Sequence, residues 1–223
     1  MIKLGKIKIL IRYLAGLPKS IYVNFRLLPF NQAIFLPIIV SRHTLLSSLS
    51  GKVSLDKLKT GIIRIGFGNV VLLDYTHQRT ILHITGNVHF CGKCKIGMGS
   101  RILVQGDLHI GENVLLSGNG KIICNKKIEI GNNTSIAWES LLMDTDEHQI
   151  YDQSSTIINP DKPITIGDNV WIAARSLVLK GSHIPHGCII GANSLITKKF
   201  ETQQAIIAGN PAKVIKHNIT WKR

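Results

Sequence analysis

One segment of the chain gathers the groups that can move a proton. Residues 143–152 read Met-Asp-Thr-Asp-Glu-His-Gln-Ile-Tyr-Asp, and they place four of the 13 acidic residues around a single histidine, His148. An imidazole titrates near neutral pH, and a carboxylate beside it fixes its tautomer and stabilises its charged form. The segment therefore predicts His148 as a general base, oriented by Asp144 or Asp146. The alternative is a solvated acidic loop without catalytic function, in which the histidine is incidental.

The elements that would position this segment follow from a six-residue period. An aliphatic residue returns at every sixth place in the series Ile166, Ile172, Val178, Ile184, Ile190 and Ile196. The tetrapeptide Ile-Gly-x-Asn also recurs, beginning at residues 110, 130, 166 and 190. Residues six apart share no helical face, and a fixed short period is typical of a β-solenoid, in which each strand stacks on its copy one coil later.

The period fails where the acidic segment lies. Between Leu142 and Ile166, the places due an aliphatic residue hold His148, Ser154 and Pro160. A long excursion from a rigid repeat is usually functional, so we expect a loop over residues 143–163 that carries the chemistry. Upstream the register shifts twice by two residues, which we interpret as widened corners between coils.

The motifs resemble those of the hexapeptide-repeat acyltransferases, and more narrowly the bacterial sugar O-acetyltransferases that modify galactosides, maltose, capsule or lipopolysaccharide. The resemblance covers about residues 61–217 and rests on Asp-x-Asp-x-His at 144–148, Pro-Ile-Thr-Ile-Gly-Asp-Asn-Val-Trp-Ile at 163–172 and Ala-Gly-Asn-Pro-Ala-Lys-Val-Ile-Lys at 208–216. It implies an all-β fold, a left-handed parallel β-helix, although parallel crossovers are otherwise almost always right-handed.

The resemblance also implies a mechanism and its residues. The family uses acetyl-CoA as the donor and is a homotrimer with active sites between subunits. His148 would take the proton of a sugar hydroxyl as it attacks the thioester directly, with a backbone N–H near Ala174 for the oxyanion, Asn119 for the acceptor and no metal. The residues matching the family's CoA-binding positions are Trp171, Ala174, Ala192, Thr197, Lys198, Lys213 and Lys216.

The basic residues are concentrated at the beginning of the chain. Residues 1–64 hold 11 Lys or Arg and a single acid, Asp56, within a chain of formal net charge +14. Residues 1–20 also fit an amphipathic helix, with Ile7, Leu10, Ile11, Leu14 and Leu17 on one face. We therefore expect a basic segment over residues 1–60 that either contacts a membrane peripherally or caps the solenoid, and a tail at 218–223. No nucleic-acid-binding motif accompanies the charge.

Four cysteines do not make a disulfide framework, and Cys91-x-x-Cys94 has no second pair to complete a zinc site. We interpret these two cysteines as small repeat residues and expect a cytoplasmic protein with reduced thiols.

Three other functions remain open from the sequence. An N-acetyltransferase acting on an amino sugar would use the same histidine. A metal lyase resembling γ-class carbonic anhydrase would need three histidines, for which His83, His89 and His109 are the candidates. A non-catalytic solenoid would bind no acetyl-CoA.

Overall fold

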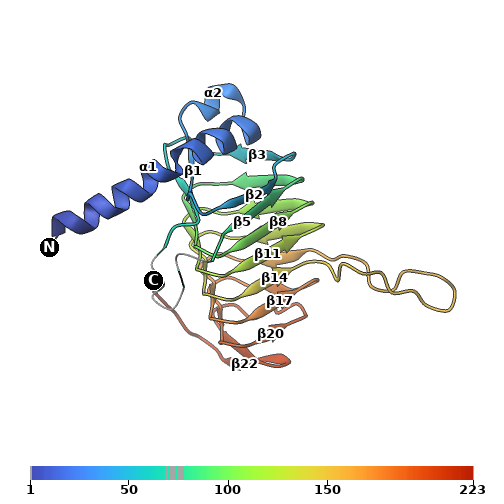
Figure 1. Cartoon of the computed structure of the whole chain (residues 1–223). Helices are drawn as coiled ribbons and strands as arrows, with labels where there is room; N and C mark the ends of the chain where they lie inside the picture. The colour runs from blue at the N-terminus through green and yellow to red at the C-terminus, as the bar shows by residue number, and fades with distance from the viewer. Residues whose placement is uncertain (1, 69, 71–73, 75–77, 223) are drawn as a thin grey trace.

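The chain folds as a three-sided parallel β-solenoid, shown in Figure 1 by a computed structural model that describes residues 2–68, 70, 74 and 78–222. Each coil visits three sheets in turn. The first sheet stacks the strands β1 (Ile38–Val40), β4 (Ile63–Ile65), β7 (Cys94–Ile96), β10 (Val114–Leu116), β13 (Ser135–Ile136), β16 (Trp171–Ile172), β19 (Ile189–Ile190), β21 (Ile206–Gly209) and β22 (Ala212–Lys216).

The other two sides of the solenoid are parallel throughout. The second sheet stacks β2 (Leu45–Ser48), β5 (Ile81–Ile84), β8 (Arg101–Val104), β11 (Lys121–Cys124), β14 (Leu141–Met143), β17 (Leu177–Leu179) and β20 (Leu195–Ile196). The third stacks β3 (Lys52–Leu55), β6 (Asn87–Phe90), β9 (Asp107–Ile110), β12 (Lys127–Ile130), β15 (Ile164–Ile166) and β18 (His183–Ile184). Among the named strands of the described residues, β22 alone runs antiparallel to its neighbour, as the end of a hairpin with β21.

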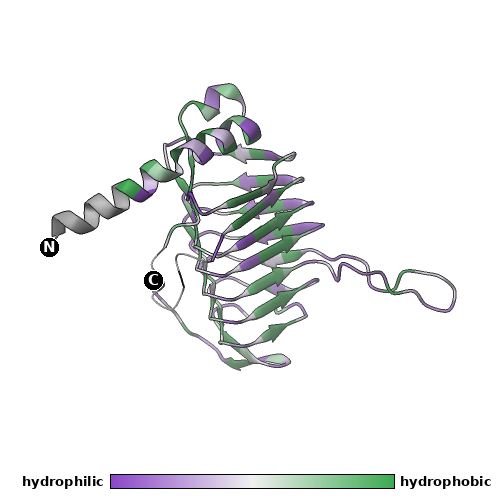
Figure 2. Cartoon of the chain, in the orientation of Figure 1, coloured by the Kyte–Doolittle hydropathy of each residue, from purple (hydrophilic) through white to green (hydrophobic). Residues whose placement is uncertain are grey.

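The six-residue aliphatic series forms the core, which confirms the solenoid prediction. All six of its residues are at most 2% exposed, and each pairs with its copy in the adjacent coil, as Ile166 does with Ile184. Hydrophobic and hydrophilic residues alternate along the longer strands in Figure 2 because alternate side chains face the interior and the solvent.

The Ile-Gly-x-Asn motif builds corners. Asn113, Asn133 and Asn169 have φ values of 59°, 54° and 53°, a left-handed conformation that Asn tolerates better than most residues. The glycine is needed for a close approach between coils, since a Cβ on Gly131 would lie 2.4 Å from the backbone of Gly167. The motif therefore serves both turning and stacking.

The shifts of the six-residue register in the earlier coils arise from wider corners, as expected. Leu108 pairs with Ile128, whereas Ile166 pairs with Ile184, so a coil shortens from 20 residues to 18. The two extra residues lie between the second and third sheets, for example between β11 and β12.

The helix α1 (Ile2–Leu27) covers the open end of the solenoid, followed by the short α2 (Phe30–Ala33). In α1, the Asn24 side chain donates to Ile38 O at 2.7 Å and accepts from Ile38 N at 3.1 Å. Ser20 Oγ of the same helix accepts from Val40 N at 2.9 Å. These bonds satisfy the otherwise unpaired edge of β1. The second half of α1 is thus a cap.

The stacked strands begin earlier than the sequence suggested. Strands β1, β2 and β3 form the first coil, within the residues 1–60 that were expected to precede the solenoid. The boundary at residue 61 differs because this coil lacks the hexad motif and borrows its packing from α1. Among the described residues, no helix combines the length and apolar character needed to cross a bilayer.

Candidate active site

The loop at residues 143–163 leaves the solenoid between β14 and β15 and projects away from it as a long arm (Figure 1). Tyr151 and Ile157 form an isolated antiparallel bridge near the tip, so the arm folds back on itself. The loop predicted from the break in the six-residue period is therefore present, and it carries His148.

Asp144 anchors the base of this loop. The residue is fully buried, and its carboxylate accepts the backbone N–H groups of Asn125, Lys126 and Lys127 at 2.7, 2.9 and 2.7 Å. Both carboxylate oxygens are engaged in closing the corner of the preceding coil. Asp144 is thus a structural anchor rather than the orienting partner of His148 that the sequence left open.

Asp146 belongs to a clamp on the loop. Its carboxylate accepts from the Lys180 ammonium and from Asn159 Nδ2, the latter at 2.8 Å, and Asn159 Nδ2 also donates to His148 O at 2.8 Å. The Lys180 and Asn159 donors hold the pKa of the Asp146 carboxyl below its usual value. Asp146 therefore fixes the backbone around His148, although its carboxylate does not touch the imidazole ring.

His148 itself is exposed on a groove of about 530 Å³. The groove is lined by Lys126 of the preceding coil and by loop residues that include Glu147, Gln149 and Pro160. Within the described part of the chain, no hydrogen bond or ion pair joins its ring to a carboxylate. The sequence predicted a preformed pair of histidine and aspartate, and one chain alone does not form it.

Replacing Lys180 by methionine tests the clamp. We expect the turnover number to fall by up to about 100-fold, because a displacement of about 1 Å of a catalytic group can cost that much. The free energy of unfolding should change by less than about 1 kcal/mol, since the ion pair with Asp146 is largely exposed on the carboxylate side. Steady-state kinetics and urea unfolding measure the two effects, and an unchanged turnover number would contradict the positioning role.

A second group of predicted residues meets at the corner between the first and second sheets. Asn119, Ala174 and Ala192 lie at equivalent turns of different coils, and Asn193 N donates to Ala174 O at 3.0 Å. The Ala174 N–H donates to no backbone carbonyl among the described residues. That leaves it available for an oxyanion.

The corner opens into a polar groove of about 610 Å³. Asn119 lies in its wall together with four cations, Arg79, Arg101, Lys121 and Arg175. Arg175 is paired to Glu139 at 2.7 Å. The groove thus suits a polar or anionic ligand.

The residues predicted to bind CoA occupy the C-terminal coils. Trp171 on β16 is 40% exposed, and the Trp221 ring packs against it at a centroid distance of 5.9 Å. Trp221 Nε1 donates to Asn169 O at 2.6 Å, so the C-terminal tail returns along the first sheet. Thr197 and Lys198 are exposed just after β20, and Lys213 and Lys216 are exposed on β22.

Sequence reasoning missed three residues of this region. Lys180 and Asn159 clamp the loop, and Trp221 covers part of Trp171. Lys180 lies 34 positions from its partner Asp146, a separation that no local motif signals. A tryptophan in a short polar tail was the only available hint for Trp221.

The three histidines considered for a lyase do not converge within the chain. His89 and His109 stack at a centroid distance of 4.9 Å, but His83 lies on the second sheet, where its Nδ1 is 3.3 Å from Ser47 Oγ. The sequence interpretation of Cys94 as a repeat residue agrees with its burial, whereas Cys91 is only partly buried and faces His109.

Comparison with known proteins shows what these features resemble. A family model described as bacterial transferase hexapeptide (six repeats) matches residues 163–198. The chain is 35% identical over 116 residues to the polysialic acid O-acetyltransferase of Escherichia coli O1:K1 / APEC, covering 51% of this chain and 38% of that protein. It is 28% identical over 143 residues to the putative lipopolysaccharide biosynthesis O-acetyl transferase WbbJ of Escherichia coli K12, covering 59% and 72%.

Residues 163–198 carry the hexapeptide repeats of bacterial transferases. The crystal structure of the polySia-specific acetyltransferase NeuO superimposes on this chain with a TM-score of 0.66 at 24% identity, covering 83% of this chain and 82% of that one. This likeness confirms the left-handed parallel β-helix. The resemblance to hexapeptide-repeat transferases that the motifs indicated is likewise confirmed.

Proposed function

We propose that this acyltransferase transfers an acetyl group from acetyl-CoA to a hydroxyl of a surface-polysaccharide saccharide, as in capsule or lipopolysaccharide biosynthesis. The observation that carries the proposal is His148 on a clamped loop of a hexapeptide-repeat solenoid whose small-residue corner presents a free N–H at Ala174. The resemblance to polysaccharide O-acetyltransferases supports the acceptor class.

The reaction follows from these groups. The His148 imidazole accepts the hydroxyl proton while the sugar oxygen attacks the thioester carbonyl, and the oxyanion is stabilised by the Ala174 N–H. The tetrahedral intermediate collapses with cleavage of the C–S bond, and the imidazolium returns its proton to the CoA sulfur. Asn119 orients the acceptor. No step in this sequence requires a metal.

The two halves of the site lie at different corners of one chain. Ala174 and Asn119 lie between the first and second sheets, whereas the His148 loop leaves between the second and third. A homotrimer with the loop of one subunit over the corner of the next would join them, and we propose this assembly. Trp171, Ala192, Thr197, Lys198, Lys213 and Lys216 would then hold CoA along the C-terminal coils, with the lysines near its phosphates.

Mixing two inactive variants tests the shared site. His148→Ala removes the base, and Ala174→Trp blocks the corner. Co-refolded in equal amounts, they should recover about a quarter of the wild-type activity, because random trimers place an intact loop over an intact corner at one interface in four. Neither variant alone should be active, and absence of recovery in verified mixed trimers would contradict a site shared between subunits.

The type of bond formed with the acceptor, ester or amide, can be measured directly. Mass gain of an acetyl group on a saccharide, lost again in mild alkali, identifies an ester. An alkali-stable gain would instead favour the amino-sugar N-acetyltransferase. The cations of the polar groove, Arg79, Arg101, Lys121 and Arg175, favour anionic saccharides in such a screen.

We also propose that the first part of α1 contacts an anionic membrane peripherally. Three of the residues that the sequence placed on its apolar face are exposed: Ile11 and Leu14 are each 58% exposed and Leu17 is 37% exposed. An exposed apolar stripe among basic residues fits the interface of an anionic bilayer. Such contact would hold the enzyme near a lipid-linked acceptor on the cytoplasmic side.

Introducing negative charges on this stripe tests membrane contact. The double variant Ile11→Glu, Leu14→Glu should lose at least about 90% of its binding to anionic vesicles, because each change removes apolar insertion and adds repulsion. Vesicle co-sedimentation measures the effect. The control Leu58→Glu alters another exposed apolar residue away from the helix and should bind as wild type. Equal vesicle binding by the wild type, the double variant and Leu58→Glu would show that the stripe does not contact the membrane.

A further inference from the structure

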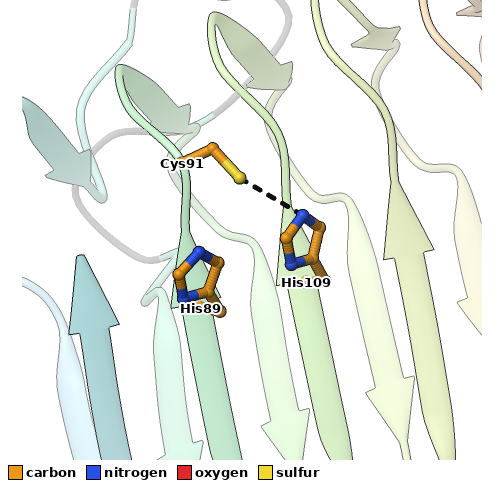
Figure 3. A group of neighbouring side chains, drawn as sticks. All are labelled: His89, Cys91 and His109. Carbon is orange, nitrogen blue, oxygen red and sulfur yellow. Dashed lines mark hydrogen bonds between the residues drawn. The ribbon is translucent and has the colours of Figure 1, made fainter. Parts of the chain in front are cut away.

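A cluster of metal-ligating side chains lies on the outer face of the third sheet, toward the capped end of the solenoid. His89 on β6 and His109 on β9 are register partners, and Cys91 directly follows β6 (Figure 3). The ligand atoms of His89, Cys91 and His109 all lie within 4.8 Å of one another, and Cys91 Sγ is 3.2 Å from His109 Nε2.

A carboxylate that can supply a fourth ligand lies beside this group. Asp56 follows β3, one coil earlier, and its Oδ1 is 3.1 Å from His89 Nε2. The same carboxylate contacts the Cys91 thiol and, with desolvation as the larger cause, raises the thiol pKa. The carboxylate thus lies against two of the three ligands, His89 and Cys91, beside the set of atoms that are within 4.8 Å of one another.

Two of the donor separations approach those around a tetrahedral ion. Bonds of about 2.0–2.3 Å in a zinc tetrahedron place neighbouring donors roughly 3.3–3.8 Å apart, close to the two separations of 3.1 and 3.2 Å seen here. His89 is also held from behind, since its Nδ1 is 2.7 Å from Ser54 Oγ. A bond to the far nitrogen fixes the ring and its tautomer, as in known metal sites.

We propose that Asp56, His89, Cys91 and His109 bind one transition-metal ion, best suited to Zn²⁺. Mixed nitrogen, sulfur and oxygen donors in a tetrahedron are typical of zinc. Binding converts the Cys91 thiol to a thiolate and releases its proton to solvent, with no change of oxidation state. The site lies away from the His148 loop and the Ala174 corner, and its role is distinct from acetyl transfer.

The ion would join three successive coils. Asp56 comes from the first coil, His89 and Cys91 from the second and His109 from the third. The terminal coils of a solenoid have a neighbour on one side only and are the first to open. A metal bound across them would stabilise the capped end.

Cobalt binding to the full chain tests the proposal. The protein is stripped with a chelator under reducing conditions and titrated with Co²⁺. We expect one ion per chain, the sulfur-to-cobalt charge-transfer band in the near ultraviolet and the d–d bands of a tetrahedral ion, all displaced by Zn²⁺. Cys91→Ser should lose the charge-transfer band. His109→Ala should weaken binding by at least about tenfold.

His83→Ala is the matched control, because His83 lies on the neighbouring sheet of the same coil and also contacts a serine. It should bind cobalt as wild type. Circular dichroism establishes that each variant is folded, and zinc should raise the melting temperature of wild type but not of Cys91→Ser. No charge-transfer band in the wild type, or a band that survives Cys91→Ser, would overturn the site.

Discussion

Replacing His148 by alanine is expected to lower the turnover number by about 10² to 10⁴, the usual contribution of a general base. Without the imidazole, the attacking hydroxyl must lose its proton to water, while the rest of the site stays intact. Binding of CoA should be unchanged, because the candidate CoA residues lie on other strands and corners. Steady-state kinetics and calorimetric titration with CoA measure the two quantities.

His183→Ala is a matched control for this experiment. His183 is a partly exposed histidine on β18, outside the loop and outside both grooves. Its loss should leave the turnover number within about twofold of wild type, as for most surface substitutions. A His148→Ala protein that keeps more than a tenth of the activity would exclude His148 as the base.

Replacing Asp144 by alanine is expected to lower the free energy of unfolding by about 3–5 kcal/mol. The change leaves three partly buried N–H groups of residues 125–127 without their acceptor. Asp144→Asn should also be costly, because its amide can turn only one oxygen toward these donors and points an NH₂ group at the others. Urea unfolding monitored by circular dichroism gives the values.

Asp146→Ala supplies the comparison for Asp144. Asp146 is exposed and held mainly by Lys180, so its loss should change the free energy of unfolding by less than about 1 kcal/mol. The two aspartates, two positions apart in one motif, should therefore differ severalfold in their effect on stability. Equal effects would show that the Asp144 contacts do not anchor the corner.

The N-terminal helix shows where a pattern was informative but incomplete. The apolar face read from the sequence includes Ile11 and Leu14, yet the cap is made by Ser20, Asn24 and Val23 on another face. Polar side chains pack there because the edge of β1 presents unpaired backbone groups that only hydrogen-bonding residues satisfy. Hydropathy alone does not reveal that need.

The candidate site shows a similar division. Asp144 and Asp146 look equivalent in the motif, but one is buried under the corner of the preceding coil and the other is paired with Lys180. Their roles depend on which backbone groups and cations the coils bring close, from residues 17 to 34 positions away. The cluster of Asp56, His89, Cys91 and His109 likewise exists only because parallel stacking aligns three coils.

By itself the sequence determined the solenoid, its corners and the place of the loop. A six-residue period permits only one stacking of aliphatic residues, and Gly and Asn mark the turns through their backbone freedom. The tertiary structure alone decided which groups meet across coils: the anchor at Asp144, the clamp of Lys180 on Asp146, and the separation of His148 from Ala174. Contacts between coils depend on the corner lengths and on side-chain reach, neither of which the period encodes.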